Sequence, residues 1–299
     1  SLYASFQAGR ASTKQLVALA RNLAANPDTY ASDAGIDNLE ALAGAGLMDD
    51  KARAAFRKFV AALYQPRLAQ LGFDPRTGAY AGEDPEKSQR RQQVVGRMAG
   101  AARDAEVRAK LSSAATAFLA GDKAALDAAY YAPALTAWIA PGGLESAKAL
   151  MGHALASEDP VFRPTALEVI GTSGDAKVAA WILNEFKDSR LRTSERLNLI
   201  RSVIQTGGTR DMGFEWLKTN FEQLTTGSGG IFFTSRLPSM LAGYCSAERA
   251  DEIAAMLRPR FAGRTGALEL ERTLERVRSC GVLKQARAKE FSKAIARIK

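Results

Sequence analysis

The side chains that most often do chemistry in enzymes are scarce in this chain of 299 residues. There is one histidine, His153, in an apolar helical stretch, so neither a histidine cluster nor an HExxH zinc helix can be built. Ser–His or Cys–His catalysis would have to use His153, and no nucleophile elbow lies near it. A lone histidine in such a setting is typical of a hydrogen-bonded structural residue. The sequence therefore predicts no catalytic residue and no metal ligand.

The two cysteines, Cys245 and Cys280, supply neither the spacing of a zinc site nor the number needed for a disulfide framework. Each lies in or beside an apolar helical segment, which favours buried free thiols. We expect two unpaired thiols, which leave the redox compartment undecided.

A glycine-rich run and several carboxylate pairs are two other patterns that could indicate a functional site, but neither meets the requirements of one. The run Gly227–Gly230 has the glycine content of a phosphate-binding loop, but the Lys and Ser/Thr that complete such a loop do not follow it. We interpret it as a flexible connection between helices. Carboxylate pairs such as Glu185 with Asp188 lie on polar faces, and none has the apolar setting that raises a carboxyl pKa.

Almost every segment has the periodicity of a helix, because alanine is abundant and no long stretch alternates apolar and polar residues. Helices are predicted over residues 13–25, 36–47, 51–70 and about 86–121. Within the third, an apolar stripe recurs at the spacing of a core-facing helix; its members are Phe56, Phe59, Val60 and Leu63. A loop rich in glycine and proline follows it over residues 72–85.

From residue 159 onward the predicted helices come in pairs. One pair runs from Asp159–Pro160 to Ile170 and then through Trp181 to Phe186. It recurs 34 to 35 residues later, where the matching residues are Val203-Ile204, Trp216 and Phe221. Such pairs cannot bury their apolar faces alone, so they stack into α-solenoids.

Local signals define the second pair and the helices after it. Thr193 or Ser194 is predicted to cap the first helix of the pair, and Gly207 and Gly208 to end that helix in a left-handed conformation. A third pair is predicted over residues 231–242 and 246–257, and a terminal helical region over 267–299. We predict an all-α fold, a superhelical HEAT- or armadillo-like array of antiparallel helix pairs. It forms one domain over residues 1–299. The opening SLYASF favours a piece of a longer protein.

The chain has a net charge of +9, and residues 250–299 hold 12 lysines and arginines against six acidic residues. A basic C-terminal segment indicates an acidic partner or nucleic acid, or simply the solvated faces of helices. The basic residues of 284–299 fit a solvated terminal helix better than a groove. No apolar run approaches the ~18 residues of a membrane span, so no membrane partner is predicted.

Residues 191–224 carry a resemblance to a known family. LRTSE, then Gly207-Gly208, then FEWLKTNF over residues 214–221 follow the order seen in the C-terminal α-helical domain of M1-family zinc aminopeptidases, of the endoplasmic-reticulum aminopeptidase-like type. The family's segment of Trp, an apolar pair, a basic residue, any residue, Asn and an aromatic is one residue shorter here. Supporting stretches lie elsewhere in the chain: Phe59-Val60 with Tyr64, Pro66 and Leu71-Gly72-Phe73, Ser228-Gly229-Gly230, and Tyr244-Cys245-Ser246.

The resemblance implies a non-catalytic domain that covers the catalytic cavity and controls peptide access. It implies no cofactor in this chain, with zinc in an upstream catalytic domain that the chain lacks. The implied partners are that domain and peptide substrates, without nucleic acid. No catalytic residue carries over. Arginines at helix–turn junctions suit the carboxylate end of a peptide, which makes Arg192, Arg210 and Arg236 the candidate contacts.

The alternative function is a basic helical-repeat scaffold that binds nucleic acid or protein partners. The net charge motivates the nucleic-acid hypothesis, which predicts binding with steep salt dependence. Solenoid architecture motivates the protein-scaffold hypothesis.

Overall fold

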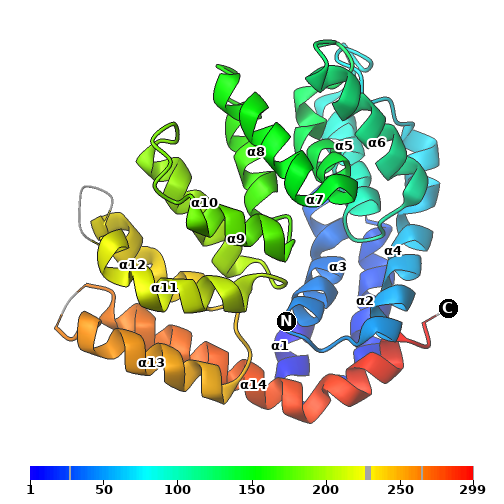
Figure 1. Cartoon of the computed structure of the whole chain (residues 1–299). Helices are drawn as coiled ribbons and strands as arrows, with labels where there is room; N and C mark the ends of the chain where they lie inside the picture. Colours follow the sequence, from blue (N-terminus) through cyan, green and yellow to red (C-terminus); the bar gives the residue numbers. More distant parts are fainter. Residues whose placement is uncertain (27, 226–229, 264, 299) are drawn as a thin grey trace. The chain divides into compact units, whose positions relative to one another are not determined.

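The computed structural model describes residues 1–26, 28–225, 230–263 and 265–298 (Figure 1). Ser228 and Gly229, which contribute to the family resemblance, and most of the glycine run therefore lie outside the described residues. Helices are the only regular elements in the described ranges, where no strand occurs. The predicted all-α array of helix pairs is confirmed.

The chain divides into two compact units. Unit 1 comprises Ser1–Ala134 together with Leu283–Lys299, and unit 2 comprises Leu135–Val282. Two helices, α7 (Tyr131–Ala156) and α14 (Ala267–Ile295), contribute residues to both. The single domain expected over residues 1–299 stays a prediction.

Unit 1 is built from six α-helices, a short 3₁₀ helix and the two shared helices. The six are α1 (Leu2–Gln7), α2 (Thr13–Ala24), α3 (Thr29–Gly44), α4 (Asp50–Leu71), α5 (Pro85–Ala99) and α6 (Ala105–Leu119), and the 3₁₀ helix η1 spans Ala128–Tyr130. Side-chain caps explain several starts: Ser12 forms a capping box with Gln15, and Asp49 accepts from the N–H of Ala52. The predicted run over 86–121 is two helices, because Arg103 between them has a φ of 53° that no helix continues.

A buried arginine holds the glycine- and proline-rich loop between α4 and α5. Arg91 donates to the carbonyl oxygens of Leu71 (2.9 Å) and Gly72 (3.1 Å), forms two hydrogen bonds with the Glu83 carboxylate, and lies 3.5 Å from the centroid of the Tyr80 ring. Its hydrogen bonds with Arg91 lower the pKa of Glu83 to about 2. Because the guanidinium of Arg91 donates to these partners, its positive charge is tolerated in the protein interior.

The end of α14 packs into unit 1. Phe291 is fully buried, with its ring centroid 5.7 Å from that of Phe6. The Ser292 hydroxyl donates to the Leu47 carbonyl (2.9 Å) and accepts from the Asp49 N–H (2.9 Å). The expectation of a simply solvated terminal helix is therefore wrong for the face of α14 that carries Phe291.

Unit 2 is the stack of helix pairs. After the rest of α7 come α8 (Phe162–Gly171), α9 (Ala176–Asn184), α10 (Thr193–Gln205), α11 (Arg210–Thr225), α12 (Gly230–Met240) and α13 (Ala247–Phe261), followed by the first part of α14. Figure 1 shows α8 to α13 as successive hairpins, with α10 packed against α8, α9, α11 and α12. Within this stack the Phe186 ring, two residues beyond α9, packs edge-on at 4.9 Å against Trp216. Aromatic residues of the two copies of the repeat thus contact each other across neighbouring pairs.

Two expectations about α10 are wrong in detail. Its N-cap is Arg192, whose backbone N–H bonds to the Glu195 carboxylate (2.8 Å), so Thr193 and Ser194 lie within the first turn instead of capping it. At the other end, Gly207 and Gly208 are absent from the positive-φ residues. Gly208 is required for a different reason, because a Cβ there would lie 2.9 Å from the carbonyl oxygen of Gly174 in the turn between α8 and α9.

No helix in the described part of the chain is both long enough and apolar enough to cross a membrane.

Candidate functional site

The three candidate arginines all lie in unit 2, but they are not brought together. Arg192 precedes α10 and Arg210 begins α11, so these two lie at opposite ends of α10, about 20 Å apart for a helix of 13 residues. Arg236 lies within α12, one turn before its end. The side chains of Arg192 and Arg236 are exposed, and neither guanidinium forms an ion pair within the described residues. Contact with a peptide stays a prediction for all three.

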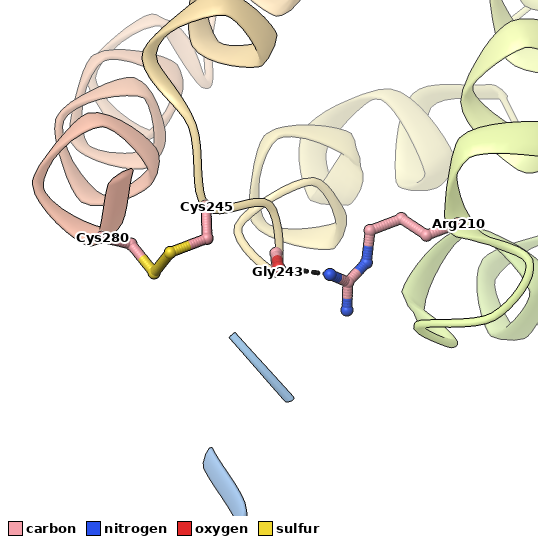
Figure 2. The surroundings of a disulfide bond; sticks show 4 residues. All are labelled: Arg210, Gly243, Cys245 and Cys280. Carbon is pink, nitrogen blue, oxygen red and sulfur yellow. Dashed lines mark hydrogen bonds between the residues drawn. A yellow bond between two sulfur atoms is a disulfide. The ribbon is translucent and has the colours of Figure 1, made fainter. Parts of the chain in front are cut away.

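Arg210 has an intramolecular role. Its guanidinium donates to the carbonyl oxygens of Gly243 (2.5 Å) and Gln205 (3.2 Å), while the Tyr244 hydroxyl donates to the carbonyl oxygen of Arg210 (2.8 Å). Figure 2 shows the guanidinium pointing at Gly243, in the turn that leads to Cys245. Arg210 therefore fastens the end of α10 to the turn before α13.

A second arginine completes this cluster. Arg249 lies 4.8 Å from the ring centroid of Phe214 and 5.1 Å from that of Tyr244, and it pairs with Asp211 (2.9 Å) and Glu252 (2.6 Å). Burial raises the pKa of Tyr244 well above its ordinary value, so its hydroxyl stays protonated and acts as a donor. The sequence indicated only the Tyr244-Cys245-Ser246 turn, because Arg210 lies 34 residues before Tyr244, and Asp211 lies 38 residues before Arg249.

Cys245 and Cys280 form a disulfide, so the expectation of two free thiols is wrong (Figure 2). Their Cα atoms are 4.8 Å apart, and the bond joins the turn before α13 to α14. Gly281 makes this approach possible, because a Cβ there would lie 2.9 Å from the Cα atom of Ser246. The spacing of the two cysteines could not predict the disulfide, because they are 35 residues apart in sequence and only the packing of the helices brings them together.

Unit 2 offers little room for a ligand near the repeat's aromatic residues. The pocket beside Trp181 and Phe186 has a volume of about 20 Å³, close to that of one water molecule. His153 is exposed on α7 and its imidazole forms no hydrogen bond within the described residues, so the expected structural role is wrong. Across the described ranges, no group of three or more His, Cys, Asp or Glu side chains could hold a metal ion.

Arg163 and Glu195 tie adjacent repeats together. The guanidinium of Arg163, on α8, makes two bonds of 2.7 and 2.9 Å to the Glu195 carboxylate at the start of α10. These bonds lower the pKa of Glu195. Of the polar residues of unit 2 described so far, Arg163, Glu195, Arg210 and Arg249 are therefore occupied in holding the helix pairs, whereas His153, Arg192 and Arg236 are exposed.

The model of the family described as the ERAP1-like C-terminal domain matches residues 1–279. Among curated proteins, no sequence matches the chain.

Proposed function

Because the chain belongs to the ERAP1-like C-terminal domain family, we propose that it is the non-catalytic C-terminal domain of an M1-type zinc aminopeptidase. In this proposal it covers the catalytic cavity and controls which peptides enter. The observation that carries the proposal is the family match over most of the chain. The stack of helix pairs in unit 2 supports it, because such a stack presents an extended surface suited to enclosing a peptide.

Zinc belongs to the proposed upstream domain. His153 is the only histidine, and the described residues contain no group of ligands that would hold the ion, so this chain does not fit a zinc site. We therefore assign no catalytic step to its residues. Their proposed contribution is to exclude bulk water and large proteins from the cavity.

The proposal is tested with three proteins: this chain, the upstream catalytic domain, and the two joined. Hydrolysis is measured with an aminoacyl p-nitroanilide and with a series of peptides of increasing length. We expect no hydrolysis by this chain with added zinc. We also expect the ratio of kcat/KM for peptides to that for the nitroanilide to differ at least about tenfold between the joined protein and the catalytic domain alone. Hydrolysis by the isolated chain, or an unchanged ratio, would overturn the proposal.

Arg192 and Arg236 are the proposed contacts for the peptide's carboxylate, since their guanidinium groups are exposed and without an ion pair in the described ranges. The Arg192→Ala/Arg236→Ala variant of the joined protein should raise KM about tenfold for peptides with a free carboxylate, because a hydrogen bond to a charged group contributes about 1.5–3 kcal/mol. Amidated peptides should show no such change. The Arg272→Ala/Arg276→Ala variant, which removes two exposed arginines of α14, is the matched control. An equal rise in KM for amidated peptides would contradict the assignment.

A further inference from the structure

A large groove lies in unit 1, between α2 and the last turns of α14. It has a volume of about 940 Å³ and is open to solvent. One wall is the α2 segment from Lys14 to Asn22, and the other runs from Ala286 to Ile298. The second wall follows residue 279, where the family match ends, so membership of the family does not imply this groove.

The rim of the groove is strongly basic. Four exposed cations along it form no ion pair within the described residues: Lys14, Lys289, Lys293 and Arg297. Lys289 and Lys293 lie one turn apart on α14, and Arg297 follows in the turn after the helix ends at Ile295, so the three form a row of cations along this wall. The acidic residue of the groove, Glu290, accepts hydrogen bonds from Thr13 (3.0 Å) and Arg287 (3.1 Å). Its charge is therefore already compensated within unit 1.

The floor is apolar and built from small side chains. Ala18 and Ala286 are exposed, and Val17, Ala294 and Ile298 are half-buried. Side chains of this size let another backbone approach closely. A surface that binds only phosphates needs no such floor, because phosphate contacts are polar. The combination of an apolar floor with a basic rim complements a segment that has an apolar face between acidic ones.

The structure of the two walls of the groove indicates which conformation the bound segment has. The α2 wall and the other wall as far as Ile295 are α-helices, and the backbone N–H groups of the three residues after Ile295 are bonded to carbonyl oxygens of α14, so an extended peptide would find few backbone partners there. A helix brings its own backbone hydrogen bonds and can lay its apolar face in the groove. The helical part of this wall, from Ala286 to Ile295, is about 15 Å long, which matches between two and three helical turns.

We propose that the groove between α2 and the end of α14 binds an acidic amphipathic α-helix of a partner protein. The apolar face of that helix packs on Ala18, Ala294 and Ile298, and its flanking carboxylates pair with the row from Lys289 to Arg297. The site is separate from the proposed peptide contacts in unit 2, so its test does not depend on aminopeptidase activity.

The test uses the full chain and a fluorescent, end-blocked peptide of about 18 residues, or five turns. Leucines stand at the i, i+3, i+4 and i+7 positions of the peptide and glutamates at most others. Fluorescence anisotropy at physiological ionic strength should show saturable binding. A scrambled peptide of the same composition and a peptide with lysine in place of glutamate should bind at least about tenfold more weakly.

Two variants locate the binding. Lys289→Glu/Lys293→Glu should weaken binding at least about tenfold, and Ala18→Trp, which fills the floor, should abolish it. Arg272→Glu/Arg276→Glu makes the same charge change at the same spacing elsewhere on α14, and it should change affinity less than about twofold. Circular dichroism and Tm confirm that each variant is folded.

Several results would overturn the proposal. These are the absence of saturable binding, equal binding of the scrambled peptide, or equal loss in the Arg272→Glu/Arg276→Glu control. Tighter binding of a duplex DNA probe that the Lys289→Glu/Lys293→Glu variant loses would assign the groove to nucleic acid. A dimer of the chain that Ala18→Trp dissociates would assign it to a second copy.

Discussion

At the scale of single residues, the buried polar groups of unit 1 are held by arginines that each form hydrogen bonds or ion pairs with several residues. Arg97, on α5, donates to Asp33 (2.6 Å) and Glu40 (2.5 Å) and also pairs with Asp37, all three on α3. The hydroxyl of the buried Tyr64 donates to Asp33 (2.6 Å). Burial raises the pKa of Glu40 despite its bond to the guanidinium. Three carboxylates therefore depend on one cation.

Replacement of Arg97 should make stability depend on pH. In Arg97→Met, the buried Asp33 loses its ion pair, and the half-buried Glu40 loses the guanidinium that lowers its pKa, so the pKa of Glu40 in the folded state rises further above that of the unfolded chain. The folded state then binds more protons, and its stability rises as the pH falls. Relative to the unmodified chain, we expect a loss of about 3–4 kcal/mol at pH 7 and a smaller loss at pH 5.

Chemical denaturation at both pH values measures this difference. Lys58→Met, at an exposed position of α4, is the matched control and should shift stability by less than about 0.5 kcal/mol. A loss that is equal at pH 7 and pH 5 would show that the carboxylates around Arg97 do not govern it.

At the scale of elements, unit 2 is held together at the turns between its helices. Gly208 lets one inter-helix turn rest on the backbone of Gly174, and Arg210 binds the turn at Gly243. The disulfide then fixes that turn to α14. Each of these links has at least one end in a turn between helices, and the backbone groups of such turns are free of helical hydrogen bonds and available to neighbours.

Removal of the disulfide should destabilise unit 2. A cross-link that closes a loop of 35 residues contributes about 4 kcal/mol in the chain-entropy account, so Cys245→Ser/Cys280→Ser should lose up to that amount. Denaturation followed by tryptophan fluorescence measures it, since Trp138, Trp181 and Trp216 all lie in unit 2. Reduction of the unmodified chain should give the same loss, and the double variant should not respond to reductant. A variant as stable as the oxidised chain would refute the role assigned to the bond.

At the scale of the whole molecule, the two ends of the chain meet in the core of unit 1. Phe6 and Phe291 pack together, and Arg287 donates to the carbonyl oxygens of Phe6 (3.4 Å) and Ala11 (3.1 Å). Unit 1 therefore completes its packing only after the entire sequence of unit 2 has been made. This arrangement gives it contacts of high sequence separation, which form slowly in folding.

Phe291→Ala tests this arrangement. Loss of a fully buried phenylalanine should lower the free energy of unfolding of unit 1 by about 3–5 kcal/mol. Val282→Ala, one residue before the segment and 66% exposed, is the control and should cost less than about 0.5 kcal/mol. Hydrogen exchange should show faster exchange in α1 and α2 for Phe291→Ala and little change in α10 and α11. Uniform acceleration across both units would contradict a local role.

The sequence by itself determined the elements and the family. Helix periodicity is a local property, so the helix pairs of residues 159–261 and the resemblance over 191–224 could be identified without a structure. The residue at which a helix begins was not determined in the same way. Thr193 and Ser194 both have hydroxyls that could cap α10, but the helix begins at Thr193, where the Glu195 carboxylate bonds to the N–H of Arg192.

Only the tertiary structure decided which distant residues meet. The disulfide between Cys245 and Cys280, the three carboxylates around Arg97, and the groove between α2 and α14 join positions that no periodicity relates. The apolar stripe of a helix specifies that it will be buried, but many partners can bury it. Which residues then approach within bonding distance depends on the packing of whole helices, since one methyl group at Gly208 or Gly281 would prevent the observed contacts.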